Sequence, residues 1–353
     1  MMGNPTALQI VWFTLIAILW SGYFFLEGFD FGVGMLLGVL GKSDMDRRLM
    51  INAIGPTWDG NEVWLLVAGG ATFAAFPVWY ATVFSAFYLA LFLILAALIF
   101  RGVAFEYRGK GLSEKWRKWW DAAIILGSAI PAILWGVAFG DFVHGIPLNQ
   151  AGHFTGNFFS LLSPYSIFTG LTTGVVFATH GALFLSLKTT GELRKRTQRL
   201  TRKLAPAAMA FIFAFLAWTY FNANHINDTG VVPGILPVGA LMLAVAAVVL
   251  VQEGYFGWAF TSIGASIVGI TATLFLNLYP RVLVSSTSNA FSLTIPQAAS
   301  AHYTLVVMTI VAAIFTPLVL LYQGWTYYVF RKRISIPGTG GEETMPSAAP
   351  TPD

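Results

Sequence analysis

Residues 7–40 read ALQIVWFTLIAILWSGYFFLEGFDFGVGMLLGVL, and the only charged residues in this run are Glu27 and Asp30. A bilayer core about 30 Å thick needs roughly 20 apolar residues per helix, so the run predicts a transmembrane helix that carries two acids. Of the 353 residues, 56% are hydrophobic and 10% are charged, whereas soluble domains carry about 25% charged residues. The chain is therefore predicted to be an all-α integral membrane protein.

Nine stretches meet or approach the length of a membrane span. They are residues 7–40, 49–75, 78–106, 120–141, 163–188, 203–223, 234–252, 256–279 and 301–330. Residues 1–336 are thus predicted to form one polytopic membrane domain. The remaining residues, 337–353, are rich in Gly, Pro, Ser and Thr, which predicts a disordered tail.

The basic residues predict the orientation. With nine spans, every Lys and Arg except Arg281 falls on the same side of the membrane. The positive-inside rule then places the N-terminus outside and the C-terminus in the cytoplasm. The net charge of +4 is explained by this orientation, so no nucleic-acid partner is expected.

Charged residues inside membrane spans are costly, and by default they indicate a functional site. Glu27 and Asp30 are three residues apart, which puts both carboxylates on one face of a helix. Gly28 and Gly32 are expected to give that face a flat strip against which another helix can close.

The second expected span carries the run Trp58-Asp59-Gly60-Asn61-Glu62-Val63-Trp64, again with two acids three residues apart. Asp30 lies ten residues before the cytoplasmic end of span 7–40, and Asp59 lies about ten residues after the start of span 49–75. At 1.5 Å per residue both would sit roughly 15 Å inside the membrane. This placement predicts a proton relay through Asp30 and Asp59, which would exchange protons through water or Asn61.

Two other roles for these acids stay open. They could pair with Arg101 or with a partner chain and hold the bundle together, or they could coordinate a cation. Glu27 and Glu62 could be structural even if Asp59 and Asp30 conduct protons. Arg101 itself lies near the end of its span, where a snorkelling side chain is the more common outcome and inward pairing with Asp30 or Asp59 is the rival.

Metal and haem ligands are sparse. The chain has no cysteine and five histidines, and no two of these histidines are four residues apart. No catalytic residue, metal site or haem site is therefore expected within this chain.

Several runs resemble subunit II of the bacterial cytochrome bd-type quinol oxidases. These runs are residues 27–34, 50–64, 73–77, 101–108, 136–140 and 155–159. The resemblance covers nearly the whole membrane part, and the first two runs are long and specific.

The resemblance implies a heterodimer with a homologous subunit I in the bacterial cytoplasmic membrane. Each subunit would have nine helices, arranged as two four-helix bundles plus a peripheral helix. Subunit I would hold two haem b groups and one haem d, and the complex would pass electrons from membrane quinol, ubiquinol or menaquinol, to oxygen. The resemblance leaves open whether a small single-helix subunit joins, and whether a quinone or lipid fills a pseudo-symmetric pocket in this chain.

For this chain the resemblance implies a haem-free scaffold that helps to deliver cytoplasmic protons to the oxygen-reducing haem. Asp59 is the first candidate for that route and Asp30 the second. Trp64 and the pair Gly69-Gly70 lie where the family has been proposed to admit oxygen from the lipid.

Three rival functions are weighed against this one. A proton-coupled transporter would also need carboxylates at mid-membrane, but it would be expected to show broken helices and repeat symmetry. The catalytic haem subunit is disfavoured by the histidine spacing. A cyanide-insensitive oxidase of the same family would share these motifs.

Overall fold

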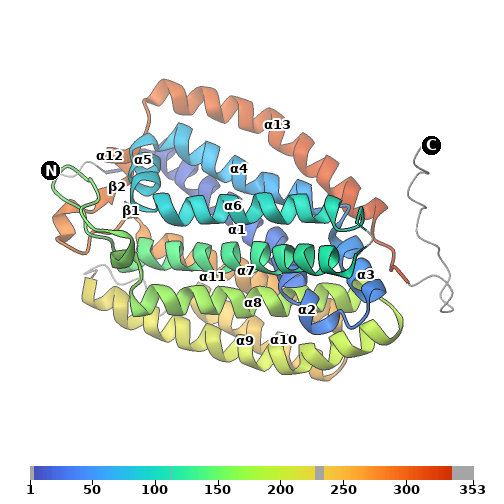
Figure 1. Ribbon diagram of the computed structural model, residues 1–353. Coiled ribbons are helices and arrows are strands. Elements are labelled where there is room, and N and C mark those ends of the chain that lie inside the picture. Colours follow the sequence, from blue (N-terminus) through green and yellow to red (C-terminus); the bar gives the residue numbers. More distant parts are fainter. Residues whose placement is uncertain (1–3, 112, 227–233, 336–353) are drawn as a thin grey trace.

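The computed structural model describes residues 4–111, 113–226 and 234–335, and Figure 1 shows an elongated bundle of helices. The predicted tail at 337–353 lies outside the described residues. The long helices are α1 (Ala7–Met35), α4 (Trp58–Ala75), α6 (Tyr88–Tyr107), α7 (Glu114–His144), α8 (Pro164–Lys188), α9 (Gly191–Ile226), α10 (Ile235–Gln252), α11 (Phe256–Leu278) and α13 (His302–Val329). The shorter elements are α2 (Leu37–Leu40), α3 (Asp44–Ile54), α5 (Pro77–Ala86), η1 (Phe158–Leu161), β1 (Arg281–Leu283), η2 (Asn289–Phe291), β2 (Leu293–Thr294) and α12 (Ile295–Ala298).

Among the residues that the structure describes, eight helices are long and apolar enough to cross a membrane, judged by length and composition alone. They are α1, α6, α7, α8, α9, α10, α11 and α13. The ninth expected span corresponds to α4, an 18-residue helix that starts at Trp58 and has the polar residues Asp59, Asn61 and Glu62 near its start. The all-helical, multi-pass architecture is therefore confirmed.

The prediction of one helix over residues 49–75 is wrong. The chain forms α3 up to Ile54 and restarts as α4 at Trp58. Pro56 lies in the break, and it has no amide hydrogen to continue the helical hydrogen bonds. As a consequence Asp59 lies in the first turn of α4 rather than ten residues into a continuous helix.

Other boundaries also differ from the expected ones. Span 7–40 divides at Leu36 into α1 and α2, and span 78–106 divides at Phe87 into α5 and α6. Helix α9 begins at Gly191, twelve residues before the expected start at 203, because the basic loop before it is itself helical. Lys, Arg and Glu favour helices, so a hydropathy pattern underestimates the length of a helix that projects beyond the lipid.

Helix α1 runs through the centre of the bundle. It packs against α4, α7, α8 and α11, whereas α13 lies on the outside and touches mainly α1 and α4 (Figure 1). An aromatic cluster fills the space around α1, with Trp20 lying 4.8 Å from Trp135 and 4.9 Å from Phe139 between ring centroids. The second half of α1, from Trp20 to Gly34, is therefore mostly buried, whereas Val11 and Ile18 nearer its start are exposed.

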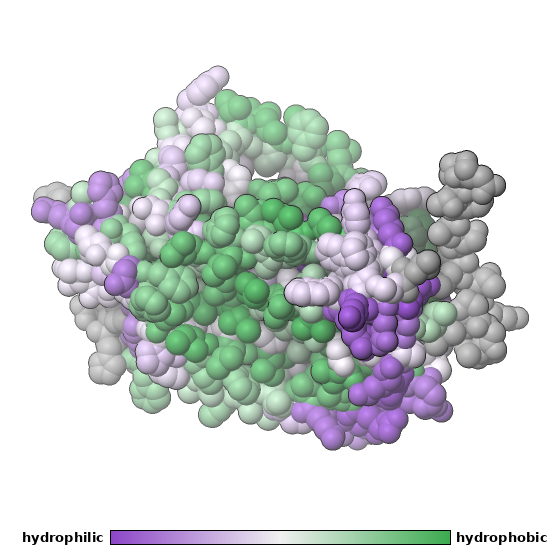
Figure 2. All heavy atoms as spheres, viewed as in Figure 1, coloured by the Kyte–Doolittle hydropathy of each residue, from purple (hydrophilic) through white to green (hydrophobic). Residues whose placement is uncertain are grey.

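Figure 2 shows an apolar band across the middle of the molecule, with a larger group of hydrophilic residues at one end and a smaller group at the other. The segments that follow α1, α6, α8 and α13 all reach the end with the larger group, whereas β1, which begins at Arg281, lies at the other end (Figure 1). We refer to the first as the basic end. The grouping agrees with the predicted separation of Arg281 from the remaining basic residues.

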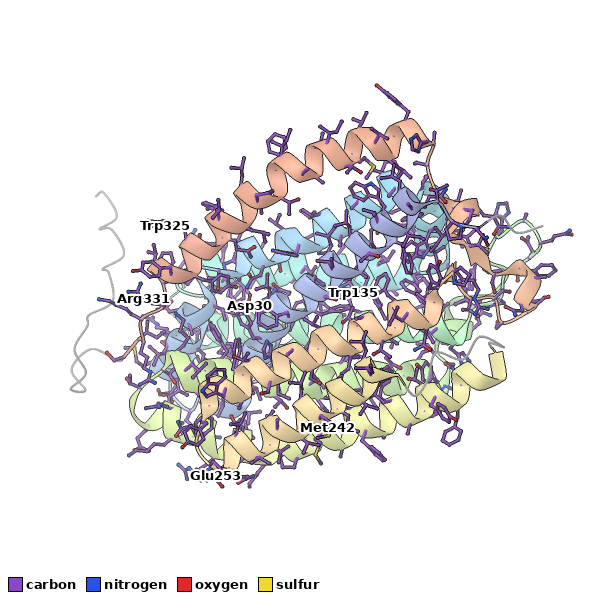
Figure 3. All side chains as sticks on the ribbon, turned by 180° about the vertical axis from the view of Figure 1, so that it is seen from behind. Asp30, Trp135, Met242, Glu253, Trp325 and Arg331 are labelled. Atoms are coloured by element: carbon purple, nitrogen blue, oxygen red, sulfur yellow. The ribbon has the colours of Figure 1, made fainter. Side chains whose placement is uncertain are left out.

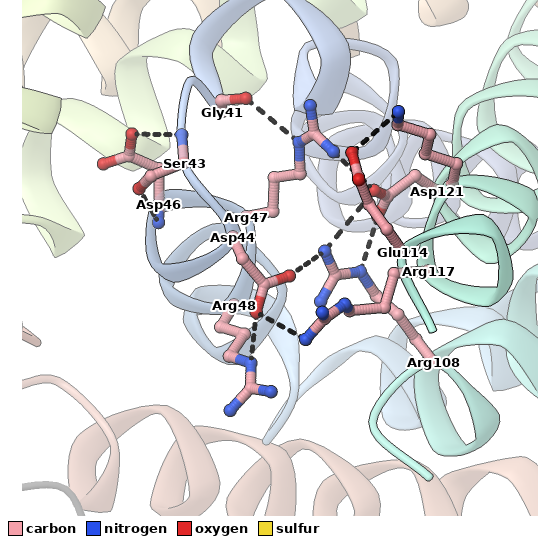
Figure 4. Close-up of polar contacts among 11 residues, drawn as sticks. Gly41, Ser43, Asp44, Asp46, Arg47, Arg48, Arg108, Glu114, Arg117 and Asp121 are labelled. Carbon is pink, nitrogen blue, oxygen red and sulfur yellow. Dashed lines mark hydrogen bonds and ion pairs between the residues drawn. The ribbon is translucent and has the colours of Figure 1, made fainter. Parts of the chain in front are cut away.

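Ion pairs connect the helices at the basic end (Figure 4). Asp121 on α7 accepts from Arg47 at 2.8 Å and from Arg108 at 2.5 Å, and Arg108 also donates to Asp44 on α3 at 2.8 Å. Burial alone would raise the pKa of the Asp44 carboxyl, but the hydrogen bond from Arg108 and the charges of neighbouring arginines outweigh it and lower that pKa. The Asp44 carboxyl therefore stays ionised at neutral pH, and these contacts tie α3 to α6 and α7.

Candidate proton-handling site

The two acids of α1 lie inside the bundle. Glu27 and Asp30 are both 0% exposed. On the α8 side, a Cβ atom on Gly32 would lie 2.7 Å from the backbone nitrogen of Gly181, and one on Gly28 would lie 2.8 Å from the ring of Phe177. The predicted closing of another helix on this glycine strip is thus confirmed. The strip lies on a different face from the carboxylates, however, because these reach α4 and α6.

Arg101 of α6 points into the bundle and is 0% exposed. Its Nη1 group donates to the carboxylate of Glu27 in a short contact and to Oε1 of Glu62 at 2.7 Å. The guanidinium carbon also lies 4.9 Å from the ring centroid of Phe31 and 5.3 Å from that of Phe105. The favoured expectation that Arg101 snorkels outward is therefore wrong.

Inward pairing of Arg101 is observed, but its carboxylate partners are Glu27 and Glu62 rather than Asp30 and Asp59. The physical reason is that a buried guanidinium is stable only with carboxylates and hydrogen bonds at close range. Asp30 is not bonded to Arg101, but its carboxylate is a third negative charge near this one guanidinium. An excess of negative charge in a low-dielectric interior is costly, and a bound proton removes part of it.

Asn61 of α4 is the centre of a second set of contacts, and it is fully buried. Its Nδ2 group donates to Oδ2 of Asp30 at 2.6 Å. Its Oδ1 atom accepts from the Tyr327 hydroxyl at 2.7 Å and from the Gln323 amide at 3.3 Å. The indole Nε1 of Trp64 donates to Oε1 of Gln323 at 2.8 Å. A continuous hydrogen-bonded chain thus runs from α1 through α4 to α13.

Gln323 and Tyr327 were not among the site residues predicted from the sequence. Both lie in the apolar run 301–330 and are four residues apart, so they share one helical face. A pair of hydrogen-bonding side chains on one face of an otherwise apolar span was the available signal. Gln323 and Tyr327 are half-buried, and they connect Asp30 to the edge of the chain through Asn61.

Asp59 takes a different place from the one predicted. It is exposed on the surface of the chain, and the α4 residue that reaches Asp30 is Asn61. Glu62, one turn further along α4, has a side chain that is 21% exposed, while that of Arg101 is 0% exposed. The polar residues therefore form a graded series from the surface at Asp59, through Glu62, to the buried pair of Arg101 and Glu27.

The residues predicted for oxygen access fall on two sides of α4. Gly69 and Gly70 line an apolar cleft of about 480 Å³ between α4, α5, α6 and α7. Trp64 lines a separate groove along α1 and α11, where its ring lies against Gly22. The structure therefore does not bring Trp64 together with Gly69 and Gly70.

His180 is the most deeply buried histidine among the described side chains, at 0% exposure. Its Nε2 atom lies 3.1 Å from the carbonyl oxygen of Phe25, and its ring stacks on that of Phe260 with centroids 4.4 Å apart. The ring is therefore packed in the interior of the bundle between α1 and α11. Within residues 4–111, 113–226 and 234–335, no group of three or more acids and histidines is placed to hold a metal ion.

A small cavity lies between α1, α7, α8 and α11, lined in part by Thr169, Thr172 and Thr173. Its volume is about 50 Å³, whereas pockets for small-molecule ligands are typically ~300 Å³ or larger. The space suits water better than the ring of a quinone.

The chain is a multi-pass membrane protein in which one buried arginine and three acids meet behind a surface-exposed acid, an arrangement suited to handling protons.

The chain belongs to the cytochrome bd terminal oxidase subunit II family, whose model matches residues 8–330. It is 40% identical over 329 residues to the cytochrome bd ubiquinol oxidase subunit 2 of Bacillus subtilis (strain 168), covering 93% of this chain and 97% of that protein. It is 36% identical over 363 residues to the cytochrome bd-I ubiquinol oxidase subunit 2 of Escherichia coli (strain K12), covering 93% and 95%.

The fold is similar to that of a chain in the solved structure of the bd oxidase from Geobacillus thermodenitrificans. The TM-score is 0.72 at 17% sequence identity, over 92% of this chain and 97% of that one. The predicted family is confirmed by these relatives, and with it the role of the chain as a subunit of a quinol oxidase complex in the respiratory chain.

The buried arginine gives the first prediction. Arg101→Gln leaves Glu27 and Glu62 without their positive partner, and loss of one member of a buried ion pair costs about 3–5 kcal/mol. We expect the variant to unfold at a clearly lower temperature than the wild type in thermal unfolding of the detergent-solubilised protein. Adding Glu27→Gln to Arg101→Gln should recover part of the loss, because it removes one unpaired charge.

Arg199→Gln is the matched control, since Arg199 is exposed on α9 and makes only a 3.4 Å contact with the carbonyl oxygen of Lys195. Equal unfolding temperatures for Arg101→Gln and Arg199→Gln would contradict the role assigned to Arg101.

Proposed function

We propose that this chain is the haem-free subunit II of a bacterial quinol:oxygen oxidoreductase and that it supports subunit I while guiding protons to the oxygen-reducing haem. The two haem b groups and the haem d belong to subunit I, where membrane quinol is oxidised. The observation that carries the proposal is the buried cluster of Arg101, Glu27, Glu62 and Asp30 behind α4. Such a cluster is costly in a membrane span and is expected where protons move.

The proposed topology has nine spans in the bacterial cytoplasmic membrane. Helix α4 is the ninth, because its polar first turn borders the basic end and the rest of the helix is apolar. The basic end faces the cytoplasm, which puts the N-terminus outside and the C-terminus inside. Helices α1, α4, α6 and α7 form one four-helix bundle and α8 to α11 the other, with α13 as the peripheral helix.

The proposed proton route begins at Asp59. This acid is exposed, lies in the first turn of α4 near the basic end and is one helical turn from the partly exposed Glu62. From there protons reach the Arg101 cluster and Asp30 through water. Glu27 and Glu62 hold Arg101, whereas the carboxylate of Asp30 accepts a hydrogen bond from the neutral amide of Asn61. Asp30 is therefore the acid best suited to take up and release a proton.

Asn61 has a positioning role in this route. It donates to Asp30 while accepting from Tyr327 and Gln323, so the orientation of its amide is fixed by α13. An amide held in this way keeps the Asp30 side chain in one position. The membership of the family, together with this cluster, favours the oxidase function over the proton-coupled transporter.

A lateral oxygen route is the second part of the proposal, and it follows the cleft at Gly69 and Gly70 rather than the groove at Trp64. The cleft is almost entirely apolar and opens toward the outer face of α4 and α6. At neither glycine would a Cβ atom meet another atom within 4 Å, so both border open space. Oxygen dissolves in apolar surroundings, and an open apolar cleft offers it a path from the lipid.

The proton route is tested with Asp30→Asn and Asp59→Asn in the assembled oxidase. Loss of a proton-transferring carboxyl typically slows a reaction about a hundredfold or more where no bypass exists. We expect proton uptake coupled to oxygen reduction, followed with a pH indicator, to slow about tenfold or more in Asp30→Asn. Asp59→Asn should have a smaller effect, because a surface acid can be bypassed by water, and haem content should be unchanged in both.

Glu253→Gln is the control for this test, since Glu253 is an exposed acid far from the cluster at the end of α10 (Figure 3). Wild-type rates of proton uptake in both aspartate variants would reduce the cluster to a structural role.

The oxygen route is tested with Gly70→Leu, which fills part of the cleft. The KM for oxygen should rise several-fold while kcat at saturating oxygen and haem content stay at wild-type values. Gly239→Leu on α10 is the control, because a Cβ atom there would also meet nothing within 4 Å but the residue does not line the cleft. An unchanged KM in Gly70→Leu would rule out this path.

A further inference from the structure

A second polar site lies at the basic end, on elements other than α1, α4 and α6, which carry the Arg101 cluster. It is a cleft of about 420 Å³ where the end of α8, the start of α9, the turn between α10 and α11 and the segment after α13 meet. Figure 3 shows Glu253, at the end of α10, and Arg331, just after α13, at this same end of the molecule. The residues that matter in its lining are Leu187, Arg194, Tyr255, Trp258, Thr261 and Arg333.

Two arginines are held in this cleft by their Nε atoms. Arg194 donates from Nε to the carbonyl oxygen of Ser186 at 3.2 Å, and Arg333 donates from Nε to that of Leu187 at 3.0 Å. Both acceptors belong to the last turn of α8, where carbonyl groups lack partners within the helix. The Nη groups of both arginines are not used in these two bonds.

The position of Arg333 is fixed by the backbone of the segment that carries it. The amide of Ile334 donates to the carbonyl oxygen of Lys188 at 2.8 Å, and Thr189 and Ile334 form a parallel bridge. The Lys188 ammonium group also donates to the carbonyl oxygen of Phe330 in a short contact. Arg333 is therefore part of a built site rather than a residue on a free tail.

The two guanidinium groups lie close enough for their charges to repel each other. In the described part of the chain neither forms an ion pair with a carboxylate, and Glu192, two residues before Arg194, pairs with Lys195 instead. Neighbouring like charges without a counter-charge are unfavourable, and an anion between them would relieve the repulsion.

The remaining lining is aromatic and apolar. Tyr255 is 61% exposed and Trp258 is 69% exposed, at the start of α11. Gly254 permits the turn that presents them, with φ of +88°. Tyr and Trp are enriched where a bilayer meets water, with the ring at the level of the lipid headgroups. The cleft therefore combines paired cations with a surface that matches the upper part of an acyl chain.

We propose that this cleft binds the phosphate group of an anionic phospholipid, with Arg194 and Arg333 as its ligands and Tyr255 and Trp258 beside the glycerol and the first acyl carbons. Arginine is suited to this role because its planar group donates two parallel hydrogen bonds to phosphate oxygens. Capping of α8 alone does not account for the site, since it needs only the Nε atoms and no exposed aromatic side chains. A soluble phosphate would use the same cations but gain nothing from the aromatic wall.

The test uses thermal unfolding of the full detergent-solubilised oxidase with added lipid. Dioleoylphosphatidylglycerol should raise the unfolding temperature of the wild type, and dioleoylphosphatidylcholine should do so much less. In Arg194→Gln/Arg333→Gln the apparent affinity for phosphatidylglycerol should fall by roughly tenfold or more, because two charge-assisted hydrogen-bond partners are lost. Arg199→Gln/Arg202→Gln changes the net charge equally on the same end and should keep wild-type affinity.

Thr261→Glu provides a second variant that leaves both caps of α8 intact. Thr261 lines the cleft and bonds only to the carbonyl oxygen of Gly257, at 3.3 Å, so an acid there should weaken phosphatidylglycerol binding through repulsion while the protein folds normally. Equal protection by phosphatidylcholine, or equal weakening in the Arg199/Arg202 variant, would overturn the proposal. Protection by free glycerol phosphate at the same concentration would assign the cleft to a soluble anion and also overturn it.

Discussion

The buried ion pairs of Arg101 are the constraint on which the rest of the site depends. A guanidinium with no exposed surface must be matched by carboxylates, and Glu27 from α1 and Glu62 from α4 both reach it. Three helices are therefore fixed around one charge. Because Arg101 is occupied by two glutamates, Asp30 is left with a neutral partner in Asn61. In the proposed route, Glu27 and Glu62 hold the cation, whereas Asp30 exchanges the proton.

The hydrogen-bonded chain through Asn61 explains why a helix on the outside of the bundle matters for its interior. Helix α13 packs lightly against α1 and α4, yet it supplies Gln323 and Tyr327 to the residue that positions Asp30. Trp12 adds a contact near the other end of α13, donating from Nε1 to Oγ1 of Thr309 at 3.0 Å. Movement of the part of α13 that carries Gln323 and Tyr327 would therefore change the surroundings of Asp30.

Much of this arrangement could be predicted from the sequence, because lipid imposes simple rules. The apolar runs located the long helices, the acids in 7–40 identified buried charges, and the glycine pair predicted the close approach of another helix, which is α8. The failures have local causes. Hydropathy does not register Pro56, so the break before α4 and the exposed position of Asp59 were missed. The partners of Arg101 depend on which way α6 is rotated, and the role of Tyr327 depends on contacts between distant spans, neither of which periodicity determines.

The central claim is that the cluster holds more carboxylate groups than its single guanidinium can neutralise, so that Asp30 carries the exchangeable proton. Infrared difference spectra of the assembled oxidase, taken between its oxidised and reduced states in H2O and in D2O, test this most directly. We expect a C=O band of a protonated carboxyl group that shifts in D2O and is absent from Asp30→Asn. A carboxyl band that persists unchanged in Asp30→Asn, or the lack of any such band in the wild type, would contradict it.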